Sequence, residues 1–76
     1  MDYVEIDGRK FPKVRQILSL KNGNSAPVLC PFCDNYHWHG LGEGNGHVNI
    51  TCNGRKFIKA DDGIVLYRES GYYIIE

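Results

Sequence analysis

The stretch CPFCDNYHWHGLGEGNGHVNITC, residues 30–52, decides the fold, because it holds all three cysteines and all three histidines of the chain. It opens with Cys30 and Cys33 in a Cys-x2-Cys pair, which offers two thiolates from one tight loop. Zinc prefers thiolate sulfur and imidazole nitrogen in a tetrahedral arrangement. An odd number of cysteines cannot close a complete disulfide framework. The stretch therefore predicts one structural Zn²⁺ ion, held by Cys30, Cys33, Cys52 and one histidine.

Strand geometry suggests which histidine completes the site. If Asn45-Gly46 forms a two-residue hairpin turn, residues 36–39 pair with residues 48–52, and His39 lies opposite Cys52. Directly opposite residues have Cβ atoms only about 4.5–5.5 Å apart, close enough to share an ion. We therefore predict His39 as the fourth ligand.

The other two histidines are placed differently by the same hairpin. His37 lies on the same face of the strand as His39 and closer in sequence to Cys33, so a one-step change in register or a wider turn would make it the ligand instead. His47 would lie about 16 Å along the strand from Cys52 and on the opposite face, so it should not share the ion. Whichever of His37 and His39 is unused would orient the ligand or lie exposed.

The length of the chain explains why a metal is needed. A core built from 76 residues seldom supplies more than about 3–5 kcal/mol, so small scaffolds add disulfides, a metal or a partner subunit. We expect one zinc-binding domain over residues 1–76, with residues 30–52 as its metal segment. The first five residues carry an early acid and no long apolar run, so they predict neither a signal peptide nor a membrane span. Unpaired thiols and this amino terminus favour the cytoplasm.

Outside the metal segment, turn dipeptides separate short segments rich in β-branched and aromatic residues. The turn signals are Asp7-Gly8, Asn22-Gly23, Asn45-Gly46, Asn53-Gly54, Asp62-Gly63 and Ser70-Gly71. The predicted strands cover residues 3–6, 14–20, 26–29, 36–39, 48–52, 56–60, 64–68 and 72–75. Residues 11–20 fit a short helix as well as they fit a strand. The fold class is therefore small and mainly β: a zinc-stapled, zinc-ribbon-like meander of β-hairpins with one optional short helix.

The metal segment also resembles a known family. Its runs are Cys30-Pro31-Phe32-Cys33, His37-Trp38-His39-Gly40, Gly44-Asn45-Gly46-His47 and Cys52, followed near the end by Gly71-Tyr72. These are similar to small zinc-binding proteins encoded by bacteriophages and by bacteria rich in mobile elements. The chain departs from that pattern at Asp34, Val48 and Thr51, where the family has Gly, Arg and His. The resemblance implies a zinc module and a small regulatory protein.

A non-enzymatic binding module is the function that these features favour, since four protein ligands close the coordination sphere of a zinc ion. The module would contact a host protein or a nucleic acid. The aromatic side chains fit either a contact surface or the core: Tyr36, Trp38, Tyr72 and Tyr73. Two basic pairs could flank an aromatic platform for nucleic acid: Arg9 with Lys10, and Arg55 with Lys56. Nine basic and nine acidic residues give no net charge, so a protein partner is favoured.

Two alternatives use the same residues. In a small metal-dependent hydrolase or nuclease, His37 or His47 would act as general base beside an ion with an open position. Asp34 and Glu43 would then supply carboxylates. In a redox switch, Cys30 and Cys33 would form a disulfide.

Overall fold

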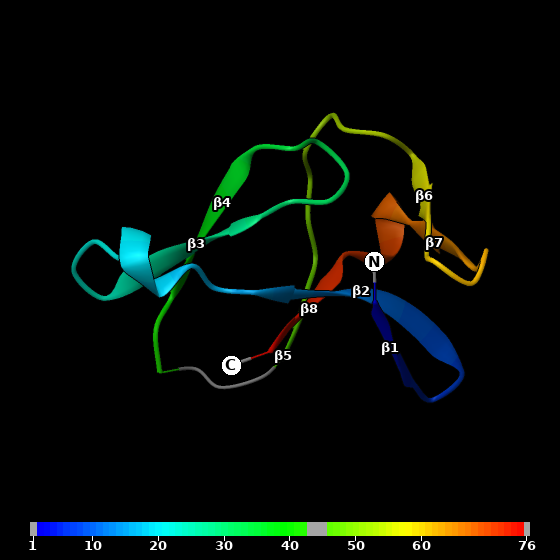
Figure 1. Ribbon diagram of the computed structural model, residues 1–76, viewed down its shortest axis with the longest axis horizontal. Coiled ribbons are helices and arrows are strands. Elements are labelled where there is room, and N and C mark those ends of the chain that lie inside the picture. Colours follow the sequence, from blue (N-terminus) through cyan, green and yellow to red (C-terminus); the bar gives the residue numbers. More distant parts are fainter. Residues whose placement is uncertain (1, 43–45, 76) are drawn as a thin grey trace.

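Short strands joined by tight turns make up the chain (Figure 1). The computed structural model describes residues 2–42 and 46–75. Its elements in chain order are β1 (Tyr3–Ile6), β2 (Arg9–Arg15), the 3-10 turn η1 (Leu18–Leu20), β3 (Ser25–Leu29), β4 (Tyr36–Gly40), β5 (Gly46–Val48), β6 (Phe57–Lys59), β7 (Val65–Tyr67), the 3-10 turn η2 (Arg68–Ser70) and β8 (Tyr72–Ile75). The small, mainly-β fold class predicted from the sequence is confirmed.

The first hairpin shows how local sequence sets local structure. β1 and β2 are antiparallel, and Ile6 pairs with Arg9 across the turn Asp7-Gly8. Both turn residues have positive φ, 52° for Asp7 and 79° for Gly8. This is the type I′ geometry that an Asp-Gly dipeptide favours.

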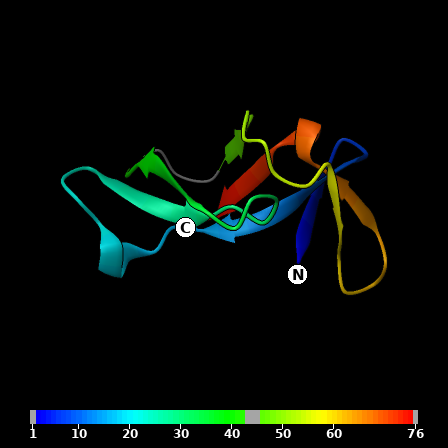
Figure 2. The same cartoon turned by 90° about the horizontal axis from the view of Figure 1, so that it is seen from above.

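The largest sheet combines the two ends of the chain. Its strand order is β1-β2-β8-β5, with β8 parallel to β2 and antiparallel to β5. Val14 of β2 lies beside Ile74 of β8, so this pairing joins segments about sixty residues apart. Figures 1 and 2 both show β8 running beside β2. The predicted meander of consecutive hairpins does not include this parallel pair.

Two further hairpins flank the sheet. β3 pairs with β4 over five positions, from Ser25 opposite Gly40 to Leu29 opposite Tyr36, and β6 pairs with β7. The predicted hairpin between residues 36–39 and 48–52 is therefore wrong: β4 pairs with β3, and β5 pairs with β8. Asn45 of its predicted turn lies outside the described residues. The reason is local: β3 pairs with β4 over five positions, and hydrogen bonds of Cys30 with Asn35 and Asp34 close the loop between them.

The segment from residue 11 to residue 20 is mostly extended. β2 runs to Arg15, and Leu18–Leu20 form a single 3-10 turn, so no α-helix forms there. Pro12 lies buried within β2 and disfavours helical geometry at Phe11. The parallel bonds to β8 then hold Lys13–Arg15 as strand.

The core and the cysteines belong to one cluster. Its buried members are Val14, Val28, Cys30, Phe32, Tyr72 and Ile74, and its partly buried members are Cys33, Val48, Ile50, Cys52 and Ile58. Tyr72 is fully buried, so it fills the core rather than a contact surface, whereas Tyr36 and Trp38 are exposed. Any ion bound by the cysteines would therefore lie at the edge of the core.

Gly71 is the position where the backbone tolerates no side chain. It joins η2 to β8 with φ 78° and ψ −153°, a region that is essentially restricted to glycine. A Cβ atom there would also collide with the carbonyl oxygen of Val48 in β5. Gly71 thus permits the close approach of β5 to the start of β8.

We predict that Gly71→Ala destabilises the fold more than Gly63→Ala. Gly63 also has a positive φ, 88°, but a Cβ there would meet nothing within 4 Å. Its substitution should therefore cost only backbone strain, about 1–2 kcal/mol. Gly71→Ala adds the collision with Val48 and should cost at least about 1 kcal/mol more. Urea unfolding of the zinc-loaded variants measures the difference, and equal costs would contradict the close approach.

Candidate metal centre

The loop between β3 and β4 presents two thiols together. The Cys30 N–H donates to the Asn35 carbonyl at 2.9 Å, and the Asp34 N–H donates to the Cys30 carbonyl at 2.9 Å. Asp34 adopts φ 60°, which turns the chain back toward β4. These bonds close the loop and bring Cys30 and Cys33 together as two candidate ligands of one site.

His37 enters the same site from β4. It lies opposite Val28 of β3, on the face of the hairpin that points to the core. Its Nε2 atom is 3.3 Å from the Cys33 sulfur. The hairpin therefore supplies three of the four candidate ligands.

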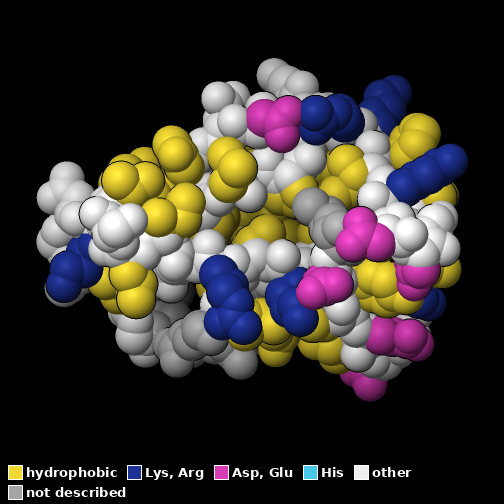
Figure 3. All heavy atoms as spheres, in the orientation of Figure 1, with side chains coloured by type: hydrophobic (Ala, Val, Ile, Leu, Met, Phe, Trp, Pro, Cys, Tyr) yellow, Lys and Arg dark blue, Asp and Glu magenta, His cyan; other side chains and the backbone are white. Residues whose placement is uncertain are grey.

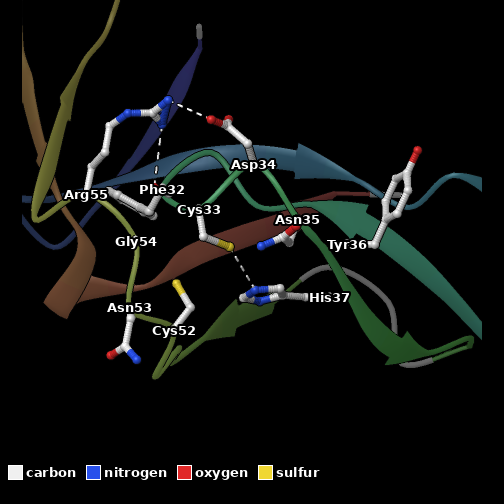
Figure 4. Close-up of a pocket in the computed structure, with 10 residues that line it drawn as sticks. All are labelled: Phe32, Cys33, Asp34, Asn35, Tyr36, His37, Cys52, Asn53, Gly54 and Arg55. Carbon is white, nitrogen blue, oxygen red and sulfur yellow. Dashed lines mark hydrogen bonds and ion pairs between the residues drawn. The ribbon is translucent and has the colours of Figure 1, made fainter.

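Cys52 comes from the segment between β5 and β6, which packs against the loop. The Arg55 N–H donates to the Phe32 carbonyl at 2.7 Å, and a Cβ on Gly54 would collide with the Phe32 carbonyl. The Arg55 guanidinium also pairs with Asp34 at 2.6 Å. Figure 4 shows the sulfur atoms of Cys33 and Cys52 and the ring of His37 pointing toward one another.

The four candidate ligand atoms lie close enough together to hold one metal ion. The atoms of Cys30, Cys33, His37 and Cys52 all lie within 4.8 Å of one another. Zinc bonds of about 2.3 Å to sulfur and 2.0–2.1 Å to nitrogen require edges of about 3.8 Å between sulfurs and about 3.6 Å between sulfur and nitrogen. The Cys30 and Cys52 sulfurs are 3.8 Å apart, and Cys33 and His37 are 3.3 Å apart. The chain therefore contains a cluster that could form a single metal site.

The thiols differ in how readily they lose a proton. Burial raises the pKa of the Cys30 thiol to about 12, because the thiolate is desolvated. Burial also raises the pKa of Cys33, but hydrogen bonds from the Asn35 backbone and the neighbouring thiols outweigh it and leave the pKa below its ordinary value. A buried thiolate at Cys30 thus requires a cation beside it, which a bound metal ion supplies.

Tyr72 connects His37 to His39. Its hydroxyl is 2.5 Å from His39 Nε2 and 3.4 Å from His37 Nδ1. Burial, together with the negative charge of the nearby cysteines, raises the pKa of Tyr72, so the hydroxyl stays protonated. With a metal on His37 Nε2, the His37 Nδ1–H would donate to the hydroxyl, which would donate to His39. Such hydrogen bonds fix the tautomer and orientation of a ligating histidine.

The sequence left two candidates for the fourth ligand, His39 as the first choice and His37 as the alternative. His37, not His39, belongs to the four-residue cluster, whereas His39 contacts Tyr72. Which imidazole binds an ion stays a prediction for the experiment below. His47, which we predicted not to bind the ion, lies outside this cluster and donates its Nε2–H to the Ser70 carbonyl at 2.6 Å.

The predicted binding residues do not gather at one place. The Arg9 guanidinium lies over the Phe11 ring at 5.1 Å, and Lys10 pairs with Glu5 at 3.7 Å. Arg55 pairs with Asp34 in the loop between β3 and β4. The β1–β2 turn lies at the lower right of Figure 1, whereas the segment that leads into β6 runs along the top.

The remaining predicted residues differ in their exposure and in their partners. Lys56 is exposed, Trp38 is 52% exposed, and Tyr73 is half-buried in β8. Of the carboxylates assigned to the enzyme alternative, Asp34 is paired with Arg55, and Glu43 lies outside the described residues.

Sequence reasoning missed the roles of Gly54, Arg55 and Tyr72. The Asn53-Gly54-Arg55 run directly after Cys52 was the available signal, because a glycine beside a metal ligand often marks a close backbone approach. Tyr72 gave no local signal. Its role depends on the parallel pairing of β8 with β2.

Comparisons with known proteins gave no match to a family model, to a curated protein or to a solved structure. The described residues form no helix of the length and apolarity required to cross a membrane. The assignment of the metal centre therefore depends on its geometry.

We predict that His37→Ala loses zinc, while His39→Ala and His47→Ala keep one zinc per chain. His37 is the only one of the three with its nitrogen beside a thiol in the described cluster. His39→Ala should bind zinc about 10- to 100-fold more weakly, because it removes a partner of Tyr72. Elemental analysis and chelator competition on reduced protein measure both quantities. If His37→Ala retains zinc and His39→Ala loses it, the fourth ligand is His39, as first predicted from the sequence.

Proposed function

We propose that this chain is a non-enzymatic, zinc-stabilised binding module. The observation that carries the proposal is the cluster of four protein ligand atoms within 4.8 Å of one another, three sulfurs and one nitrogen. A zinc ion with four protein ligands has no position left for water or substrate, and such sites are structural.

A bound ion would join two parts of the chain that lie far apart in the sequence. Three ligands come from the β3–β4 hairpin and the fourth comes from the segment between β5 and β6. Because the site does not exist in the unfolded chain, the free energy of zinc binding adds to the free energy of folding. The ion thus supplies what a small core lacks.

The enzyme alternative finds less support. His37 stands among the thiols as a candidate ligand, and His47 uses its Nε2–H in a bond to Ser70. Asp34 is ion-paired with Arg55. These candidate acid and base groups are engaged elsewhere, so the geometry favours a binding function over a small metal-dependent hydrolase or nuclease.

The outer face of the β3–β4 hairpin suits a protein partner. Leu29, Tyr36 and Trp38 are each about half exposed, at 51%, 54% and 52%. Neither strand contains a charged residue. Figure 3 shows hydrophobic side chains gathered at its left, over η1, β3 and β4. Aromatic residues without charges at the centre are typical of protein interfaces, so we assign this face to a protein.

The sequence resemblance adds a biological setting to this proposal. The Cys30-to-Cys52 pattern favours a small regulatory protein of a bacteriophage or mobile element that contacts a host protein. The three cysteines are free thiols, which suits the reducing cytoplasm of a host cell.

We predict that Co²⁺ in the site is closed to added ligands. The cobalt-loaded chain should show the visible spectrum of a tetrahedral thiolate site, and that spectrum should stay unchanged when azide or cyanate is added. Free Co²⁺ in the same buffer, whose water ligands the anions can replace, is the positive control for a spectral shift. A wild-type spectrum that shifts would indicate an open position and would favour the enzyme alternative.

We also predict that Trp38→Ala removes capture of the protein partner and leaves zinc content unchanged. Trp38 points away from the core, so its loss should not disturb the metal centre. The measurement is affinity capture from nuclease-treated host lysate, with Ile6→Ala in β1 as an exposed apolar control on another element. Capture that disappears after nuclease treatment would replace the protein partner with a nucleic acid.

A further inference from the structure

The outer face of the β6–β7 hairpin carries a second pair of exposed aromatic rings. Phe57 lies directly opposite Tyr67, and the two are 52% and 53% exposed. The next pair along the hairpin, Ile58 and Leu66, points to the other side, where Leu66 is buried. Burial of Leu66 anchors the hairpin, so Phe57 and Tyr67 project from neighbouring positions on its outer face.

A groove runs beside these rings. It encloses about 460 Å³ and is lined by Lys56, Phe57, Tyr67, Arg68 and Glu69. Arg68 is held in position because its Nη1 donates to the Gly54 carbonyl at 2.6 Å and its N–H donates to the Lys56 carbonyl at 2.9 Å. The groove thus combines two aromatic side chains with two cationic residues, of which Arg68 is held in place by hydrogen bonds.

The charges of this face are available to a partner. Among the described residues, no ion pair engages Lys56 or Lys59, whereas Lys10, Lys13 and Arg55 are each paired with an acid. Lys59 follows Phe57 by two positions in β6, on the same face. Figure 3 shows Lys and Arg side chains bordering hydrophobic ones at the upper right, over β6. Glu69 is the one acidic residue that lines the groove.

We infer that this face binds single-stranded nucleic acid, with bases stacked on Phe57 and Tyr67 and phosphates beside Lys56, Lys59 and Arg68. Aromatic rings next to unpaired cations are the combination by which proteins bind single strands without sequence preference. The uncharged outer face of β3–β4 lacks these cations, which distinguishes the two surfaces. A duplex hides its base faces, so stacking selects a single strand.

This inference goes beyond the proposed protein contact and does not depend on how the metal site is closed. The two surfaces belong to different hairpins, so each can be removed alone. A protein that joins a partner to a single strand would act where duplex DNA is opened or where RNA is exposed.

The test is fluorescence anisotropy of the zinc-loaded chain with a labelled oligothymidylate and a labelled oligouridylate. Phe57→Ala and Tyr67→Ala should each weaken binding by at least about fivefold. Phe57→Leu, which keeps the apolar bulk but removes the ring, should weaken it as well. Tyr36→Ala, an equally exposed tyrosine on the other hairpin, should bind as the wild type does. Zinc content and Trp38 fluorescence check that each variant is folded.

Charge variants test the phosphate contacts separately. Lys56→Gln should lower the slope of log affinity against log salt by about 0.7. Glu69→Gln should strengthen binding, because it removes a repelled carboxylate from the groove.

Three results would overturn the inference. One is no binding of either oligonucleotide at low salt, another is wild-type affinity in both ring variants, and the third is equal loss in Tyr36→Ala. If Trp38-dependent protein capture persists in any of these cases, the proposed function still stands. A cobalt-loaded site that binds added anions would contradict the proposed function and leave this inference unaffected.

Discussion

The convergence of Cys30, Cys33, His37 and Cys52 is the constraint on which the rest of the structure depends. Cys30 belongs both to the buried core and to the metal cluster, so the ion site is one wall of the hydrophobic interior. Without a cation, the buried Cys30 thiol is held in its neutral form by desolvation. Metal binding and formation of the core should therefore occur together rather than in sequence.

Tyr72 connects the candidate metal centre to the four-stranded sheet. It is the first residue of β8, it is fully buried, and its hydroxyl reaches both His37 and His39. The glycine before it allows β5 to approach. A change in how β8 pairs with β2 would thus move the hydroxyl that orients His37. The order of the sheet and the geometry of the metal centre are linked through one side chain.

The sequence predicts what local chemistry determines and fails where distant strands must be matched. The Asp7-Gly8 turn and the mainly-β class followed from residue preferences, and the clustering of the cysteines followed from the Cys-x2-Cys spacing. The choice between His37 and His39 depended on which strand pairs with β4. Asn45-Gly46 suggested residues 48–52 as that strand, whereas the loop that holds Cys30 and Cys33 made β3 the partner. No local pattern reveals that β8 would pair in parallel with β2, because that contact joins the two ends of the chain.

A metal centre would also explain why several large apolar side chains are exposed on the surface rather than buried in the core. Trp38, Tyr36, Phe57 and Tyr67 are each more than half exposed, although a chain stabilised by apolar burial alone would gain by covering them. A metal ion at the cysteine cluster would replace that missing burial, since its binding free energy would contribute directly to folding. The rings lie on two hairpins, one without charges and one bordered by lysines. A metal ion bound by the thiols and His37 would thus stabilise the fold while these aromatic side chains stay exposed.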